Sequence, residues 1–210
     1  MEGVLNMIKS GVTSGTPSKI PFGVGVFFSG VEYSETVAPE LAAIKAAILG
    51  ATQDGGSLSI TPEFFAPELD GVTVAVKEFQ NKVGEKAQME TSFAEFTAEL
   101  AAKMAIGKIS ETTDGKYDVV TSSELTAGHF YDGFGYYGNH TDGRPMIVIF
   151  KHALCTSGFP MENKNKTNTV FKGTFECYSD IEYGVQKLPY AIFVRKAEGW
   201  VREEIENLAV

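Results

Sequence analysis

Residues 55–100 decide the fold class: GGSLSITPEFFAPELDGVTVAVKEFQNKVGEKAQMETSFAEFTAEL. Within them, residues 57–60 alternate polar and apolar side chains with a period of two, which predicts a strand. Asp70 and Gly71 form a strong turn signal, and the apolar run 72–76 after them predicts a second strand. The order of these signals favours strands joined by turns over a helical bundle.

The second half of this stretch predicts a third strand and then a helix. Residues 81–84 are interpreted as a turn that leads into a longer strand at 85–91. Ser92 and Glu95 have the spacing of a capping box, which predicts the start of a helix that ends near Gly107. A helix with a single apolar stripe packs on a sheet rather than standing alone. The stripe consists of Phe93, Phe96, Leu100 and Met104.

Further elements are predicted on both sides of this stretch. A short helix is predicted at 39–49, with Pro39 at its first position and Gly50 at its end. The composition, with 15 Phe, 8 Tyr and 22 Gly against a single Trp, also favours strands and turns. We therefore predict a mainly β fold of the α+β class with one flanking helix. The remaining predicted strands are 20–33, 116–122, 146–150, 170–178 and 188–194.

Three segments are predicted to be loops within a single domain that covers residues 1–210. The segment at about 9–19 is rich in Gly, Ser and Thr, and we expect a flexible arm that orders against a partner. Residues 161–168 (MENKNKTN) form a polar loop. Residues 125–143 combine Gly with aromatic residues and contain Asp-Gly turn signals at 132–133 and 142–143.

The charge of the chain argues against one class of partner. With 18 Lys and Arg against 27 Asp and Glu, the formal net charge is −9. Affinity for nucleic acid rests on Lys and Arg that neutralise phosphates, so a surface of this sign repels DNA. Sequence-specific DNA binding is therefore disfavoured.

The two cysteines and the apolar runs define the expected compartment. Cys155 and Cys177 lie in predicted strands and have no metal-ligand spacing, so we expect buried free thiols rather than a disulfide. The first residues lack the apolar centre of a signal peptide. No run approaches the roughly 18 apolar residues of a membrane span. We expect a protein made in a reducing cytoplasm, with no membrane anchor.

The sequence carries no enzyme signature. The histidines have no HxH or HxxxH spacing for a metal, and no GxSxG motif marks a nucleophile. We therefore expect no catalytic, cofactor-binding or metal-binding residue, and no cofactor. A hydrolase with a site assembled across loops, using His129 or His140, remains a third alternative. The histidine and carboxylate residues that gather in the sequence are His129, Asp132, His140, Asp142 and His152.

The aromatic segment 129–137 (HFYDGFGYY) is the best candidate for a ligand surface. Exposed rings on the rim of a β-sandwich, Tyr136 and Tyr137 among them, would stack on sugars, as in a carbohydrate-binding module. The same rings would also suit the centre of a subunit contact, where aromatic residues are enriched. Burial of these rings in the core carries as much weight as these two surface interpretations together.

The order of the segments resembles the major tail tube proteins of long-tailed bacteriophages. The resemblance covers most of the chain and rests on strand and turn patterns, not on catalytic motifs. It begins with IPFGVGVFFSGVEYS (20–34), ILGATQDGGSLSITPEF (48–64) and DGVTVAVKEFQNKVGEKAQMET (70–91). It continues with the segment 142–180, which contains MIVIFKHALC, and with KLPYAIFV (187–194).

The resemblance implies a β-sandwich or open barrel with one flanking helix. It also implies that six copies form a ring, that rings stack into a tube, and that closure of the sheets removes exposed strand edges. The implied partners are further copies of the chain and the tape-measure, tail-tip and tail terminator proteins. Genomic DNA would pass through the lumen without specific binding. The implied location is the virion tail, assembled in the cytoplasm of a bacterial host.

Two features qualify this expectation. The helix at 39–49 and the long region 107–143 are more elaborate than a minimal tube subunit, which indicates decorations on the outer surface or a related tail component such as a terminator. Phage-tail-like bacteriocins use the same subunit fold, so a prophage or bacteriocin origin is also open. The family's lumen is acidic, and residues 54–99 contain nine acidic residues against three lysines. We therefore expect an anionic set of inner strands, without assigning individual carboxylates.

Overall fold

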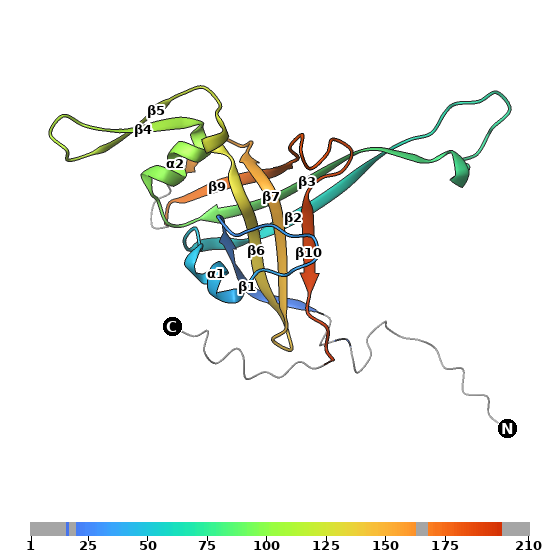
Figure 1. Ribbon diagram of the computed structural model, residues 1–210, viewed down its shortest axis with the longest axis horizontal. Helices are drawn as coiled ribbons and strands as arrows, with labels where there is room; N and C mark the ends of the chain where they lie inside the picture. The colour runs from blue at the N-terminus through green and yellow to red at the C-terminus, as the bar shows by residue number, and fades with distance from the viewer. Residues whose placement is uncertain (1–15, 17–19, 163–167, 199–210) are drawn as a thin grey trace.

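The computed structural model describes Thr16 and residues 20–162 and 168–198, and these residues form antiparallel sheets with few helices (Figure 1). The prediction of a mainly β fold of the α+β class is confirmed. The helices are α1 (Leu41–Ala46) and α2 (Ala98–Ala105), with 3₁₀ turns η2 (Lys77–Phe79) and η3 (Ala127–His129). The strands are β1 (Pro21–Phe28), β2 (Thr52–Phe65), β3 (Asn81–Phe93), β4 (Gly107–Glu111), β5 (Asp118–Ser122), β6 (Tyr131–His140), β7 (Pro145–Cys155), β8 (Met161–Glu162), β9 (Val170–Tyr178) and β10 (Tyr190–Val194).

The main sheet branches at β7. Its strands follow the order β1-β6-β7-β9-β3-β2, with β10 paired to β7 and β8 paired to β9. One edge of β7 pairs with β6, whereas the other edge is shared: residues 146–150 pair with β10, and residues 152–155 pair with β9. Figure 1 shows β9, β3 and β2 crossing β6 and β7 as a second layer. The small sheet β4-β5 is separate from the main sheet.

An aromatic core fills the space between these two layers. The ring of Phe175 on β9 stacks on Phe134 of β6 with the ring centres 4.3 Å apart, and Tyr131 meets it edge to face at 5.2 Å. Phe93 of β3 approaches the same ring at 6.0 Å. Side chains alternate between the two faces of a strand, so Val148 of β7 points into this core. Rings in offset and edge-to-face geometry add stability beyond their buried area.

A second, smaller core lies on the opposite face of β7. Ile147 and Ile149 pack there with Phe28 of β1, Val31 and Ile44 of α1. The run MIVIF of β7 is therefore buried on both faces. A strand covered on both faces has a continuous apolar sequence, which is why the sequence identified it.

Helix α1 is shorter than the predicted helix at 39–49. It starts at Leu41, with Glu40 as its N-cap, so the prediction that Pro39 occupies the first helical position is wrong. Ile44 is its single buried residue, whereas Ile48 lies outside the helix and forms an isolated bridge with Phe28. Helix α1 is short because Ile44 is the one side chain that anchors it in the second core.

The start of α2 was misplaced by the capping-box interpretation. Ser92 and Phe93 belong to β3, where Ser92 pairs with Gln53 on one side and Lys172 on the other. Thr97 caps α2 instead, and its hydroxyl accepts a hydrogen bond of 3.1 Å from the Leu100 amide. Pairing with a neighbouring strand on each side keeps Ser92 in β3, and this outweighs its local preference for a helix cap. Of the predicted stripe, Leu100 and Met104 are buried on α2, Phe93 is buried on β3, and Phe96 is 57% exposed.

The predicted strand at 72–76 and the predicted turn at 81–84 are both wrong. Residues 66–80 connect β2 to β3 and contain η2, and Asn81 already pairs with Phe65. The two strands are accordingly longer than the predictions at 57–60 and 85–91. Elsewhere the predicted strands are found, with shifted ends, and β4 was not predicted.

The largest correction concerns residues 125–143, because the predicted loop contains the central strand β6. Glycine is required there: a Cβ on Gly135 would lie 2.4 Å from both the Phe28 ring and the Val148 carbonyl oxygen. Gly133 has a φ of 55°, and a Cβ there would lie 1.6 Å from the Val31 carbonyl oxygen. The glycines that resembled turns allow close approach of neighbouring strands. Only the turn at 142–143 is found, where the Gly143 amide donates to the His140 carbonyl at 2.8 Å.

Some predictions fall outside the described residues. Apart from Thr16, the predicted arm at about 9–19 lies there, as does most of the polar loop at 161–168. Among the residues that the structure describes, no helix is long and apolar enough to cross a membrane.

The two cysteines are free and buried, as predicted. Burial, with a smaller effect of the nearby carboxylates Glu85 and Glu176, raises the pKa of the Cys177 thiol to about 12. Burial also raises the pKa of Cys155. Neither thiol is therefore ionised at neutral pH.

Because thiolate is the reactive form, we expect both cysteines of the folded protein to resist thiol reagents. At pH 8 the thiolate fraction of Cys177 is on the order of a thousandfold below that of a free cysteine. Reaction with Ellman's reagent, followed with and without urea, measures this. Rapid stoichiometric labelling without urea would contradict the buried placement.

The aromatic core makes a direct prediction about stability. Phe175 is fully buried against three other rings, so Phe175→Ala should lower the free energy of unfolding by about 3–5 kcal/mol. Phe65→Ala is the matched control: its ring is 56% exposed, and the expected change is within about 0.5 kcal/mol. Urea unfolding followed by circular dichroism compares the two variants.

Candidate assembly surface

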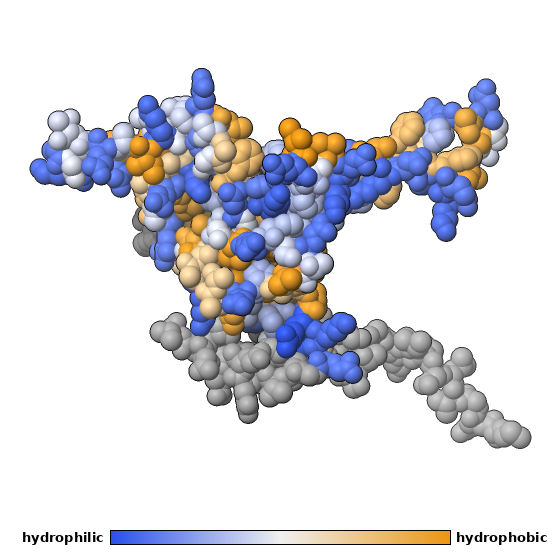
Figure 2. Space-filling view, viewed as in Figure 1, coloured by the Kyte–Doolittle hydropathy of each residue, from blue (hydrophilic) through white to orange (hydrophobic). Residues whose placement is uncertain are grey.

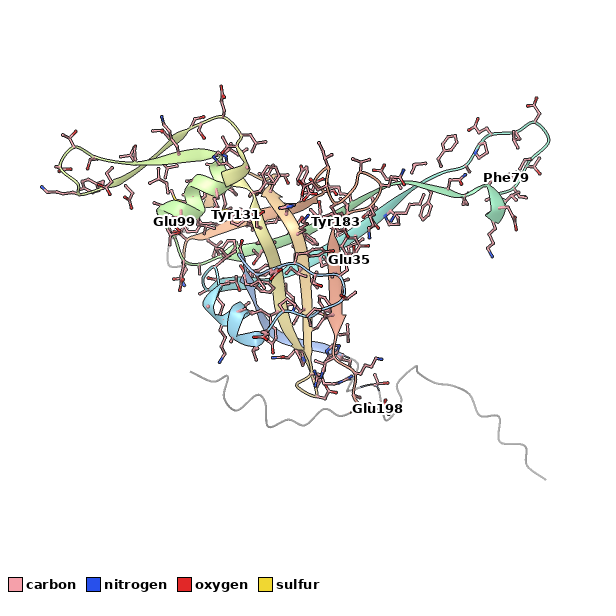
Figure 3. The ribbon with its side chains drawn as sticks, viewed as in Figure 1. Glu35, Phe79, Glu99, Tyr131, Tyr183 and Glu198 are labelled. Atoms are coloured by element: carbon pink, nitrogen blue, oxygen red, sulfur yellow. The ribbon has the colours of Figure 1, made fainter. Side chains whose placement is uncertain are left out.

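A long hairpin projects from the body of the protein (Figure 1). It consists of the outer half of β2 (60–65), the connection 66–80 and the outer part of β3 (81–86), and we call it the arm. Its two strands pair from Ile60 with Ala87 to Phe65 with Asn81, with one register shift between Glu63 and Phe64. Figure 3 places Phe79 near the far end of the arm. Beyond Ile60, which packs against the aromatic core, the backbone ladder supports the arm.

A bulge marks the inner end of β2. The pairing shifts between Gln53 and Gly56, and both Asp54 and Gly55 have positive φ angles, of 65° and 73°. Such bulges increase the local twist of a strand and redirect it. Beyond the bulge, almost every residue of β2 is exposed.

Large apolar side chains are exposed along the arm. Phe64 and Val83 are each 63% exposed, and Val74 is 72% exposed. They stand among hydrophilic residues, as the mixed colours of the arm in Figure 2 show. Exposed apolar groups that gather on one projection indicate a surface that another molecule covers. The other exposed apolar residues of the arm are Phe65, Leu69 and Val72.

The arm also carries an excess of negative charge. Between residues 63 and 80 there are four acidic residues and a single lysine, Lys77. At its base Lys82 pairs with Glu85 at 2.7 Å, and Lys86 pairs with Glu176 of β9 at 3.3 Å. The positive charges of β3 are thus neutralised locally, whereas the end of the arm remains acidic. The four acidic residues are Glu63, Glu68, Asp70 and Glu78.

A second projection lies on the opposite side of the body (Figure 1). It is formed by the β4-β5 hairpin, whose exposed apolar residues include Ile109 (43%) and Tyr117 (70%). A hollow of about 810 Å³ lies between this hairpin and α2, lined by Lys103, Lys108 and neighbouring residues. The body therefore carries unlike projections on its two sides.

The face of β2, β3 and β9 that points away from the core is polar. Ala87 and Met89 of β3 are buried in the core, so Gln88 and Glu90 between and after them lie on the opposite face. Glu90 is exposed and pairs in register with Ser57 of β2 and Thr174 of β9. Both helices pack against the cores and leave this face uncovered.

The histidine and carboxylate residues identified in the sequence serve separate contacts. His129 is buried beside Gly107, and its Nδ1 accepts a hydrogen bond of 3.0 Å from the Thr126 amide. His140 donates from Nδ1 to the Arg144 carbonyl oxygen at 3.2 Å in the β6-β7 turn. Asp142 pairs with Arg144 at 2.6 Å.

Only Asp132 and His152 of that set meet, with Asp132 Oδ1 and His152 Nδ1 2.6 Å apart. Across residues 20–162 and 168–198, no group of three or more His, Cys, Asp or Glu side chains is arranged to hold a metal ion. The contacts of His129 and His140 are structural ones.

The aromatic segment 129–137 does not form the expected exposed loop. Tyr131 and Phe134 are buried in the aromatic core, and Tyr136 packs against Phe27 of the same core. Tyr137 packs against the second core. The premise of the carbohydrate-binding alternative is therefore wrong, and core burial is the interpretation that holds.

The comparisons with known proteins leave the family open. No family model matches the chain, and no curated protein matches it. Among solved structures, a chain of the virion of a native gene transfer agent (GTA) particle is similar with a TM-score of 0.34 and 11% sequence identity. The match covers 62% of this chain and 82% of that chain.

The described residues thus define a mainly β, antiparallel α+β protein with an apolar, acidic arm. The sequence did not indicate the arm, because the apolar residues at 72–76 and at 64–65 have the pattern of core strands. A signal was nevertheless present: Pro62 and the acidic residues interrupt the apolar runs on β2.

Because residues 64–83 of the arm belong to neither core, their removal should leave the body folded. Replacing residues 64–83 with Asn-Gly joins Glu63 and Gly84, which already face each other, through a favoured two-residue turn. We expect a free energy of unfolding within about 1 kcal/mol of the parent protein. Urea unfolding and amide NMR spectra measure this; loss of the core signals would show that the arm supports the body.

Proposed function

We propose that this chain is a non-enzymatic structural subunit that assembles with copies of itself, and specifically a tail tube subunit of a long-tailed phage or prophage. The arm is the observation that supports this proposal. Its exposed phenylalanines and valines lie beyond the reach of the chain's own cores, so only another molecule can cover them. Burying apolar surface of this kind is the main favourable term in protein association.

In this proposal six copies form a ring, and rings stack into a tube. A ring requires heterologous contacts, in which two different surfaces of each copy meet. The arm and the β4-β5 projection are two such unlike surfaces. β2 is the last strand in the order of the main sheet. Pairing with a strand of a neighbouring copy would protect the outer edge of β2.

The polar face of β2, β3 and β9 is proposed to line the channel. Its carboxylates, Glu90 and Glu176, would repel the DNA backbone. The same face also carries Lys172 and Lys86, the latter paired with Glu176. Much of the negative charge of residues 54–99 lies on the arm and not on this face. Only a few carboxylates are therefore left for the expected acidic inner strands. Tape-measure, tail-tip and terminator proteins are the further partners, and the assembled virion tail is the location.

Negative-stain electron microscopy of the concentrated protein tests the proposal, with light scattering on the same sample. We expect rings or hollow tubes of uniform width. The double variant Phe64→Ser and Phe65→Ser should reduce assembly at least tenfold at equal concentration, because both rings are more than half exposed in the single chain.

Val37→Ser is the matched control. Val37 is 67% exposed but lies in the segment after β1 and is not part of the arm, so this variant should assemble like the parent protein. Featureless monomer under every condition, including incubation with tail-tip proteins, would overturn the tube proposal. Equal loss of assembly in both variants would show that the arm is not the contact.

A further inference from the structure

A network of ion pairs and hydrogen bonds fixes the connection between β9 and β10, residues 179–189, which we call the β9-β10 loop. Its centre is Asp180, whose Oδ1 accepts a hydrogen bond of 2.6 Å from the Tyr183 amide. Its Oδ2 lies 2.6 Å from Lys151 Nζ and 2.9 Å from His152 Nε2. These contacts, that of Lys151 first, hold the pKa of Asp180 well below its usual range. The loop is therefore tied to β7 through one carboxylate.

His152 bridges two carboxylates that come from different elements. Its Nε2 faces Asp180 of the loop, and its Nδ1 lies 2.6 Å from Asp132 Oδ1 at the start of β6. An ionised carboxylate only accepts hydrogen bonds, so both ring nitrogens must carry a hydrogen for both contacts to form. Only the positively charged imidazolium meets that condition. The other ionisable groups facing this site are Lys151, on the same strand, and Tyr178, opposite His152 on β9.

The hydrogen-bond partners of the three histidines require a different arrangement of ring hydrogens on each. His129 accepts at Nδ1 from a backbone amide, so its hydrogen lies on Nε2, which faces the Gly107 carbonyl at 3.1 Å. His140 carries its hydrogen on Nδ1. His152 needs a hydrogen on each nitrogen to make both of its contacts. The chain has only these three histidines, so their NMR signals can be told apart.

The network continues from Asp180 across the loop. Ser179 donates to the Gly184 carbonyl at 2.6 Å, which closes the turn. Tyr183 donates to Glu35, which also receives Lys187 Nζ at 2.7 Å, and Figure 3 shows Tyr183 and Glu35 on facing segments. The loop is held from β7 on one side and from the segment after β1 on the other.

This loop presents apolar side chains to solvent. Ile181 is 90% exposed and Val185 is 84% exposed, the highest values among the large apolar residues that the structure describes. Leu188 packs against the aromatic core and Pro189 is fully buried, so the end of the loop is anchored by packing. The polar network fixes the residues before them, including Ile181 and Val185.

We propose that His152, held as an imidazolium between Asp132 and Asp180, is a pH-dependent clamp that fixes the β9-β10 loop and the position of Ile181 and Val185. Loss of its proton removes one of the two contacts and leaves a nitrogen lone pair facing a carboxylate. The loop then loses its link to β6 through His152, whereas Lys151 still joins it to β7 through Asp180 and the Pro189 carbonyl, and both cores stay intact. The clamp is a property of the single chain and does not depend on the proposed assembly.

The clamp has two limits on the pH scale. On the acid side, the lowered pKa of Asp180 means that its contribution to stability is present above about pH 4, the ordinary value, and is lost as the pH falls toward the folded value. On the alkaline side the limit is the charge of the ring itself, because only the imidazolium can donate to both carboxylates. The loop should therefore be most ordered while Asp180 is ionised and both nitrogens of His152 carry a hydrogen.

NMR of dilute monomer from pH 5 to 9.5 tests the clamp. Long-range ¹H–¹⁵N spectra should show both nitrogens of His152 protonated at pH 5.5, and a single hydrogen on His129. Amide exchange at Tyr183 and Gly184, corrected for its intrinsic pH dependence, should rise at least fivefold as the ring loses its proton. The two transitions should share one midpoint, whereas the core amides of Ile149 and Phe175 should not change.

Two variants separate the clamp from ordinary packing. His152→Gln should have fast loop exchange at every pH, because an amide side chain cannot carry the charge. Asp132→Asn replaces a side chain that is 73% exposed and should move the transition to lower pH without unfolding the protein. A single protonated nitrogen on His152 at pH 5.5, or loop exchange that ignores the ring titration, would overturn the proposal.

Discussion

The pairing of β7 is the constraint on which the rest of the structure depends. One edge of this strand serves β6, and the other serves both β10 and β9. Two strands that share one edge cannot continue as one flat sheet, so β9, β3 and β2 form a second layer over the first. The aromatic core then fills the gap between the layers, and Ile147 and Ile149 fill the opposite side. The direction of the arm and the exposure of the polar face both follow from this branch point.

The elements that the sequence predicted well are those whose pattern reflects local burial. The strands β7 and β9 are apolar runs bounded by turn residues, and both were found. The strand β6 was missed because Gly133 and Gly135 resemble turn residues, yet they are needed where Val31 and Val148 approach closely. Such a requirement comes from neighbours that are distant in sequence. Local periodicity cannot reveal it.

The candidate site was harder to predict than the fold for a related reason. An apolar pair such as Phe64 and Phe65 has the same local pattern whether it enters a core or projects on an arm. The difference lies in how far β2 and β3 continue beyond the body, which is set by pairing between residues 52–65 and 81–93. The contacts of His152 likewise join three separate segments. In both cases the residue types were visible in the sequence, and their neighbours were not.

The charge of the arm constrains how copies can associate. Between residues 63 and 80 four carboxylates accompany one lysine, so two arm ends that meet symmetrically bring like charges together. The exposed apolar residues still favour burial, and they gain most when they meet a different surface of the neighbouring copy. A contact between unlike surfaces leaves a free copy of each surface at the two ends of any dimer, so growth continues until a ring closes or a filament extends. Under the proposed self-association, an acidic and apolar arm would therefore favour extended assembly over a closed pair.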